Sequence, residues 1–138
     1  MAELVVLGAG MMGTALAVPL VDRGHTVRLI GTHLDREIIE SLIETRHHPK
    51  LRYDVPRSID PHQVEDLGEL LPKADAVMLG VSSAGVEWAG EKLGPLLRPE
   101  QPVLMVSKGL KLEGNDLVIL PEVLKSALPP ELHRSKCR

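Results

Sequence analysis

Short apolar runs alternate along the chain with stretches of helical period. Runs rich in Val, Leu and Ile predict strands at residues 3–7, 26–30, 75–81 and 103–106, with a further short strand within residues 57–65. Apolar residues three and four apart predict helices at residues 12–23, 35–45, 66–71, 84–97 and 117–127. The stretch 46–56 shows neither period. We interpret it as a long basic loop in which His47 and His48 are solvated.

This alternation of strands and helices predicts an α/β fold. Right-handed crossovers between parallel strands give a doubly wound, mainly parallel Rossmann-type sheet with helices on both faces. We expect one domain at residues 1–128 and a disordered C-terminal tail at residues 129–138, which have no period. Thr32 with Asp35, and Ser82 with Ser83, are candidate caps for the helices that follow them.

The stretch Gly8-Ala9-Gly10-Met11-Met12-Gly13 lies between the first predicted strand and the first predicted helix. Gly-x-Gly-x-x-Gly in this context is the fingerprint of a dinucleotide site. The first glycine permits a tight turn, the second permits close approach of a pyrophosphate, and the third permits close packing of helix on strand. The N–H groups at the start of the helix then face the anion.

Ligands of such a sheet lie beyond the carboxyl ends of its strands, which selects the loops at residues 8–13, 31–33, 81–83 and 107–109. A site that prefers NAD usually has Asp or Glu at the end of the second strand, where a carboxylate binds the 2′-hydroxyl of the ribose. This chain has Gly31-Thr32-His33 there, so NADP stays open beside NAD. Thr32, His33 and Arg36 are candidate contacts for a 2′-phosphate. Thr32 as a cap is an equal alternative, and for Arg36 a solvated side chain is the favoured interpretation.

Lys108 is the candidate catalytic residue, between Ser107 and Gly109 at the carboxyl edge. An ammonium group there can hydrogen-bond a substrate carbonyl and stabilise the alkoxide that develops as a hydride arrives. The alternatives are that Lys108 contacts a phosphate or that it is an ordinary surface lysine.

Composition excludes several other classes of function. The net charge is −3, and there is one Trp, one Tyr and no Phe, so neither a basic field nor an aromatic platform for nucleic acid is present. No run of apolar residues has the length of a membrane span. A single cysteine and no secretory signal favour a reducing, cytoplasmic location.

Several segments together resemble the NAD(P)-dependent glycerol-3-phosphate dehydrogenases. They are the glycine motif, the Arg46…His48-Pro49…Tyr53-Asp54-Val55-Pro56 stretch, Gly80-Val81-Ser82-Ser83, and Val106-Ser107-Lys108-Gly109-Leu110. The resemblance implies reduction of dihydroxyacetone phosphate to sn-glycerol 3-phosphate with NADH or NADPH, in the supply of phospholipid backbones.

The resemblance also implies roles for residues. Met11 and Met12 match the pair that contacts the cofactor, and Thr32 and His33 match contacts on the adenosine side. Lys108 matches a lysine that touches both cofactor and substrate. The cofactor-binding set expected from motif and resemblance together is Gly8, Ala9, Gly10, Met11, Met12, Gly13, Thr32, His33, Ser82 and Lys108.

The family continues into a further strand and a helical substrate domain that supplies a second lysine. By this comparison the sheet is truncated before its last strand or strands, and we expect the chain alone to bind dinucleotide weakly and to be inactive. An exposed sheet edge favours self-association, with a homodimer as one form. Two other interpretations stay open: a non-catalytic nucleotide-binding module, and a related 3-hydroxyacid or ketopantoate dehydrogenase domain.

Overall fold

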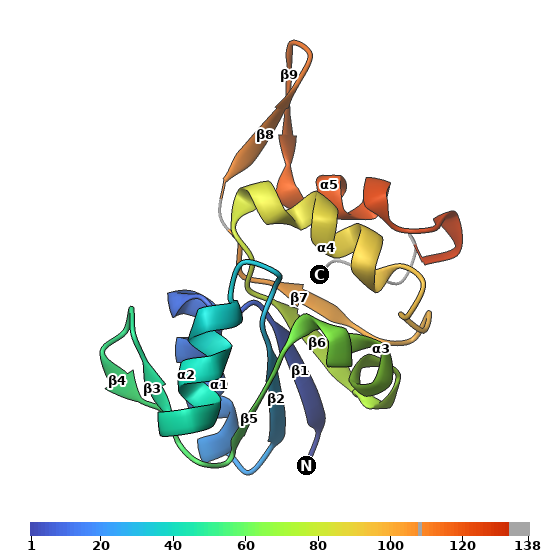
Figure 1. Cartoon of the computed structure of the whole chain (residues 1–138). Helices are drawn as coiled ribbons and strands as arrows, with labels where there is room; N and C mark the ends of the chain where they lie inside the picture. The colour runs from blue at the N-terminus through green and yellow to red at the C-terminus, as the bar shows by residue number, and fades with distance from the viewer. Residues whose placement is uncertain (108, 133–138) are drawn as a thin grey trace.

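The computed structural model describes residues 1–107 and 109–132. Its centre is a five-stranded parallel sheet with the strand order β5-β2-β1-β6-β7 (Figure 1). The strands are β1 (Glu3–Leu7), β2 (Thr26–Ile30), β5 (Ile59–His62), β6 (Ala76–Leu79) and β7 (Val103–Met105). The chain leaves β1 outward to β2 and β5 and then returns to the other side of β1. The doubly wound sheet predicted from the sequence is therefore confirmed.

Helices cover both faces of this sheet, as predicted. They are α1 (Met11–Asp22), α2 (Arg36–Thr45), α3 (Leu67–Leu70), α4 (Val86–Leu93) and α5 (Leu120–Ala127). The alternating side chains of β1 divide the core in two. Val5 and Leu7 pack in the cluster formed with α3, α4 and α5, whereas Leu4 and Val6 pack in the cluster formed with α1 and α2. Complete burial of each such side chain stabilises the fold by about 1.5–3 kcal/mol.

The region interpreted as a long basic loop contains a short antiparallel ribbon, which corrects that prediction. β3 (His47–His48) pairs with β4 (Tyr53–Asp54). His48 is fully buried rather than solvated, and His47 hydrogen-bonds the Asp54 carboxylate at 2.7 Å. The buried histidine anchors this ribbon to the body of the domain.

The last predicted helix begins later than expected. Residues predicted as its start form β9 (Asp116–Ile119), which pairs with β8 (Leu110–Glu113) in a separate hairpin. Figure 1 shows this hairpin projecting away from the sheet. α5 then begins at Leu120, with Pro121 in its first turn, where the missing N–H of proline costs no helical hydrogen bond.

The two helix caps predicted from the sequence are not formed as expected. No side-chain cap is formed by Ser82 for the 3-10 turn Ser83–Gly85 or for α4. Thr32 and Asp35 form no side-chain cap of α2 either: the Thr32 N–H donates to Asp35 Oδ2 at 2.9 Å, and the Leu34 N–H donates to Thr32 Oγ1 at 3.2 Å. α2 itself starts only at Arg36, so these contacts form the turn that leads into the helix.

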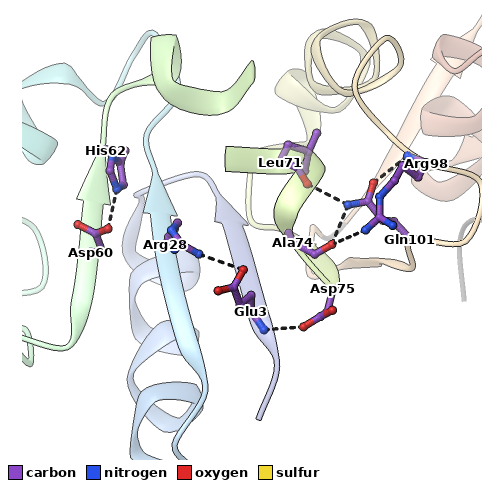
Figure 2. A network of polar contacts seen from close by, with 9 residues as sticks. All are labelled: Glu3, Arg28, Asp60, His62, Leu71, Ala74, Asp75, Arg98 and Gln101. Carbon is purple, nitrogen blue, oxygen red and sulfur yellow. Dashed lines mark hydrogen bonds and ion pairs between the residues drawn. The ribbon is translucent and has the colours of Figure 1, made fainter. Parts of the chain in front are cut away.

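A polar network closes the amino edge of the sheet (Figure 2). Gln101 is buried, and its Nε2 donates to Leu71 O at 2.9 Å and to Ala74 O at 2.8 Å. The Glu3 N–H donates to Asp75 Oδ2 at 2.7 Å. The bonds of Gln101 satisfy two backbone carbonyls that precede β6, and the bond of Asp75 satisfies the first N–H of β1, so this edge has a structural role.

The segment expected to be a tail begins with packed residues. Leu132, in the 3-10 turn Pro130–Leu132, is 2% exposed and belongs to the core beside α5. Residues 133–138 lie outside the described residues. Within the described part of the chain, no helix has both the length and the apolar character needed to span a membrane.

Candidate functional site

A groove of about 570 Å³ lies at the carboxyl edge of the sheet. Loops from separate parts of the chain line it, and its lining residues are Gly8, Gly10, Thr32, His33, Leu34, Asp35, Lys50, Gly80, Val81, Ser82, Ala84, Gly85 and Trp88. β1 lies between β2 and β6, so the loop after β1 stands where the strand order reverses. That position is where open α/β sheets bind their ligands.

Three glycines let the loops after β1 and β6 approach each other. Gly8 has φ +112°, and a Cβ on it would lie 2.6 Å from Gly80 O. A Cβ on Gly13 would lie 2.1 Å from Gly8 O, and one on Gly80 would lie 2.9 Å from Gly13 Cα. These distances are too short for any side chain, so the internal packing of the turn explains all three glycines.

Gly10 has a different environment. It is the N-cap of α1 with φ −67°, a conformation open to any residue, and no side chain caps the helix there. A Cβ on Gly10 would have no heavy atom within 4 Å. Within the described residues, nothing requires glycine at this position, whereas a ligand that came close to the start of α1 would need the space that a side chain would fill.

The start of α1 is suited to an anion. The first N–H groups of a helix lack intrahelical acceptors, and the helix dipole makes this end positive. The first turn of α1 contains no acidic residue that would neutralise it. The groove therefore fits the pyrophosphate of a dinucleotide, with Gly10 leaving the space for it.

The loop after β2 shows which groups are available for the ribose. One carboxylate oxygen of Asp35 is already used within the protein. Oδ2 accepts from the Ala9 N–H at 3.0 Å, the Thr32 N–H at 2.9 Å and the Thr32 hydroxyl at 3.1 Å. Arg36 is paired with Glu65. The hydrogen bond to Glu65 raises the pKa of Arg36 and lowers the pKa of Glu65, so both groups stay charged at neutral pH.

Across the groove, the ring of His33 lies near the indole of Trp88, with 4.9 Å between the ring centroids and a tilt of 54°. His33 follows β2 and Trp88 lies on α4. This contact joins the two halves of the domain at the mouth of the groove.

Five of the residues predicted to bind cofactor line the groove: Gly8, Gly10, Thr32, His33 and Ser82. Ala9 and Gly13 are buried behind it, and Met11 and Met12 are 55% and 50% exposed without lining it. Lys108 lies outside the described residues. Its neighbour Ser107 donates its hydroxyl to Val81 O at 2.5 Å, which brings the loop after β7 against the loop after β6.

The sequence pattern did not indicate Lys50 and Trp88 as lining residues or His48 as a contact of the glycine loop. No spacing rule connects these positions to the glycine motif, because each reaches it through the fold. For His48 and Lys50 the only signal was their nearness to Pro49 in the stretch that carried the family resemblance.

Comparisons with known proteins agree with this geometry. The family model of the NAD-dependent glycerol-3-phosphate dehydrogenase N-terminus matches residues 3–135. The NADP(+)-dependent glycerol-3-phosphate dehydrogenase of Archaeoglobus fulgidus is 40% identical over 119 residues, which are 86% of this chain and 35% of that protein. The glycerol-3-phosphate dehydrogenase [NAD(P)+] of Corynebacterium aurimucosum is 35% identical over 128 residues, 92% of this chain and 37% of that protein.

A solved structure supports the fold. The crystal structure of glycerol-3-phosphate dehydrogenase from Coxiella burnetii superposes with a TM-score of 0.79 at 24% identity, covering 96% of this chain and 38% of that chain. The present chain thus spans little more than a third of each of these proteins. With its glycine turn, its groove and this match over nearly its whole length, the chain belongs to the NAD-dependent glycerol-3-phosphate dehydrogenase family and matches the N-terminal, NAD(P)-binding region of that family.

Proposed function

We propose that this chain holds NADP or NAD in the groove at the carboxyl edge and forms the coenzyme half of a glycerol-3-phosphate dehydrogenase. The observation that carries the proposal is Gly10, whose missing side chain leaves space in the groove and serves no packing need. The uncapped start of α1 would hold the pyrophosphate, with Thr32 and His33 on the adenosine side and Ser82 on the loop after β6. Ala9, Met11, Met12 and Gly13 complete the predicted set.

The substrate proposal rests on the family. A bound reduced nicotinamide would supply a hydride to the carbonyl of dihydroxyacetone phosphate, giving sn-glycerol 3-phosphate. Lys108 is proposed to hydrogen-bond that carbonyl oxygen and to stabilise its developing negative charge. The relatives' names support this substrate over hydroxyacids or ketopantoate. Because the chain spans little more than a third of these relatives, we propose that by itself it binds coenzyme without turnover.

Trp88 allows a direct test, since it is the only tryptophan and lines the groove. Its emission overlaps the absorption of reduced nicotinamide, so titration with NADPH or NADH should quench its fluorescence to saturation. In Gly10→Ala the melting temperature should stay close to that of the wild type, because the new methyl meets no protein atom. Its coenzyme affinity should fall at least about tenfold.

Three results would count against the proposal. Equal affinity of Gly10→Ala and wild type would remove the argument from Gly10, and absence of saturable quenching by either coenzyme would remove coenzyme binding. Rapid oxidation of NADPH on addition of dihydroxyacetone phosphate would show that the chain alone is active.

The proposal also includes a homodimer, a role in phospholipid supply and a cytoplasmic location.

A further inference from the structure

The peptide groups on both sides of Ala9 are held by side chains from two other loops. The Ala9 N–H donates to Asp35 Oδ2 at 3.0 Å. The Ala9 carbonyl accepts from His48 at 2.8 Å and from the Thr14 hydroxyl at 3.1 Å. Ala9 is itself completely buried. The residue between the first two glycines of the turn is thus clamped from the loop after β2 and from the β3–β4 ribbon.

The hydrogen bonds of His48 define which ring nitrogen carries the proton. Nδ1 faces the N–H groups of Lys50 and Leu51 at 3.3 and 3.1 Å. Since these groups can only donate, Nδ1 accepts, and Nε2 carries the proton that it donates to Ala9 O. The ring is fully buried, so each nitrogen is used by the protein. One nitrogen folds the ribbon's own turn, and the other reaches the glycine loop 39 residues away.

Asp35 supplies the opposite side of the clamp. Its Oδ2 joins the Ala9 N–H to the Thr32 N–H and hydroxyl. A carboxylate on the rim of a site for an anionic ligand is electrostatically unfavourable for binding, so its presence calls for a compensating role. Here its bonded oxygen is directed at backbone donors of two loops and fixes the distance between them.

We propose that His48 and Asp35 are positioning residues for coenzyme binding. By fixing the peptides around Ala9, they hold residues 8–13 in the conformation that leaves the first N–H groups of α1 open to the pyrophosphate. Preorganisation of this kind raises affinity because the loop loses no freedom on binding. This inference rests on the proposed coenzyme site, and neither residue is assigned a contact with the coenzyme.

Two amide variants separate the two bonds of His48. In His48→Gln, the side-chain nitrogen sits where Nε2 was and can still donate to Ala9 O. In His48→Asn, the side chain can still accept from Lys50 and Leu51 in the place of Nδ1, but it is too short to reach Ala9. We expect NADPH to bind His48→Asn about fivefold more weakly than wild type, the scale of one lost hydrogen bond. His48→Gln should bind within about twofold of wild type.

The measurement is Trp88 quenching by NADPH, with the melting temperature of each variant recorded beside it. His47→Gln is the control, because His47 is a half-exposed neighbour that contacts Asp54 rather than the glycine loop. The opposite ranking, with His48→Gln weak and His48→Asn normal, would show that His48 acts only on its own ribbon and would overturn the inference. Equal NADPH affinity of wild type, His48→Gln and His48→Asn would also overturn the inference.

Asp35→Ala tests the other side of the clamp and decides the matter if His48→Asn does not fold. It should weaken NADPH binding by about fivefold or more, and normal binding would contradict the inference. Failure of the wild-type chain to bind NADPH or NADH is a distinct outcome, since it would overturn the proposed function and this inference together.

Discussion

At the scale of single residues, the glycines of the first turn divide into two kinds. The sequence motif predicts three roles, and the structure confirms the tight turn at Gly8 and the close packing at Gly13. It adds Gly80 as a third member of the same contact, which the motif does not include. Gly10 alone faces open space, as its predicted approach to a ligand requires.

The clamp residues could not be predicted in the same way. His48 and Asp35 act on the backbone of Ala9, and a backbone group has no sequence signature of its own. His48 lies in a polar, basic stretch that looks solvated, yet the fold buries it completely. Only the tertiary structure reveals that these positions meet.

We predict that coenzyme preference can be changed at the ion pair between Arg36 and Glu65. Their ion pair occupies the arginine, and the hydroxyl of Thr32 is already bonded to Asp35 and Leu34. In Glu65→Gln the guanidinium loses its carboxylate partner and becomes free to bind a 2′-phosphate. The ratio of NADPH to NADH affinity should therefore rise, by about tenfold if a charge-assisted hydrogen bond forms.

Because Glu65 occupies Arg36 in the wild type, Arg36→Gln alone should change that ratio little. The double variant Glu65→Gln/Arg36→Gln should lose the rise and leave NADH binding unchanged. Arg28→Gln is a matched control, because Arg28 pairs with Glu3 at the amino edge, away from the groove. If Glu65→Gln does not raise the ratio, or if the double variant keeps the rise, Arg36 has no part in coenzyme choice.

At the scale of elements, the strands of the central sheet were the most predictable part. β2 begins and ends where the apolar run predicts, at Thr26 and Ile30. The β8–β9 hairpin was missed, although Gly114-Asn115 between two apolar-rich runs is a hairpin signal. The competing helical period of the residues after Asp116 hid it. The apolar side chains of this hairpin are also largely exposed, with Leu112 65% and Leu117 69% exposed, so it lacks the buried face that produces a clear strand pattern.

His62 links two elements and gives a pH dependence. It ends β5, and its two ring nitrogens lie 2.7 Å from Asp60 and 2.8 Å from Asp66, in the 3-10 turn Val64–Asp66. Burial lowers the pKa of His62, but hydrogen bonds and charge attraction from the two carboxylates outweigh this effect and raise it overall. The folded state therefore binds the proton more tightly than the unfolded chain does.

The free energy of unfolding that His62 contributes should be complete below the unfolded pKa of about 6.5 and should be lost as pH rises through the higher folded pKa. Urea unfolding of wild type and His62→Gln at pH 6 and pH 8.5 measures it. The stability difference should be larger at pH 6, by less than about 1 kcal/mol, as for other partly exposed ion pairs. A difference that grows toward pH 8.5 would contradict the assignment of a charged His62.

At the scale of the whole molecule, the two edges of the sheet have different tasks. The amino edge is closed by Gln101, Asp75 and their backbone partners, whereas the carboxyl edge carries the groove. The sequence predicted this division, because parallel strands place all their following loops on one side. It could not predict how the β3–β4 ribbon and α4 close around the groove, since both arrive there through long-range packing.

The most direct test of the proposed coenzyme site is to map which residues of the chain respond to NADPH. Backbone amide NMR signals of the 138-residue protein would be recorded as NADPH is added. We predict that the signals of residues 8–13, 32–35 and 80–85 shift with one common saturation curve, while those of Glu3, Asp75 and Gln101 at the amino edge stay in place. Saturable shifts centred on the amino edge, or none at all, would contradict the claim that the glycine turn and its groove form the coenzyme site.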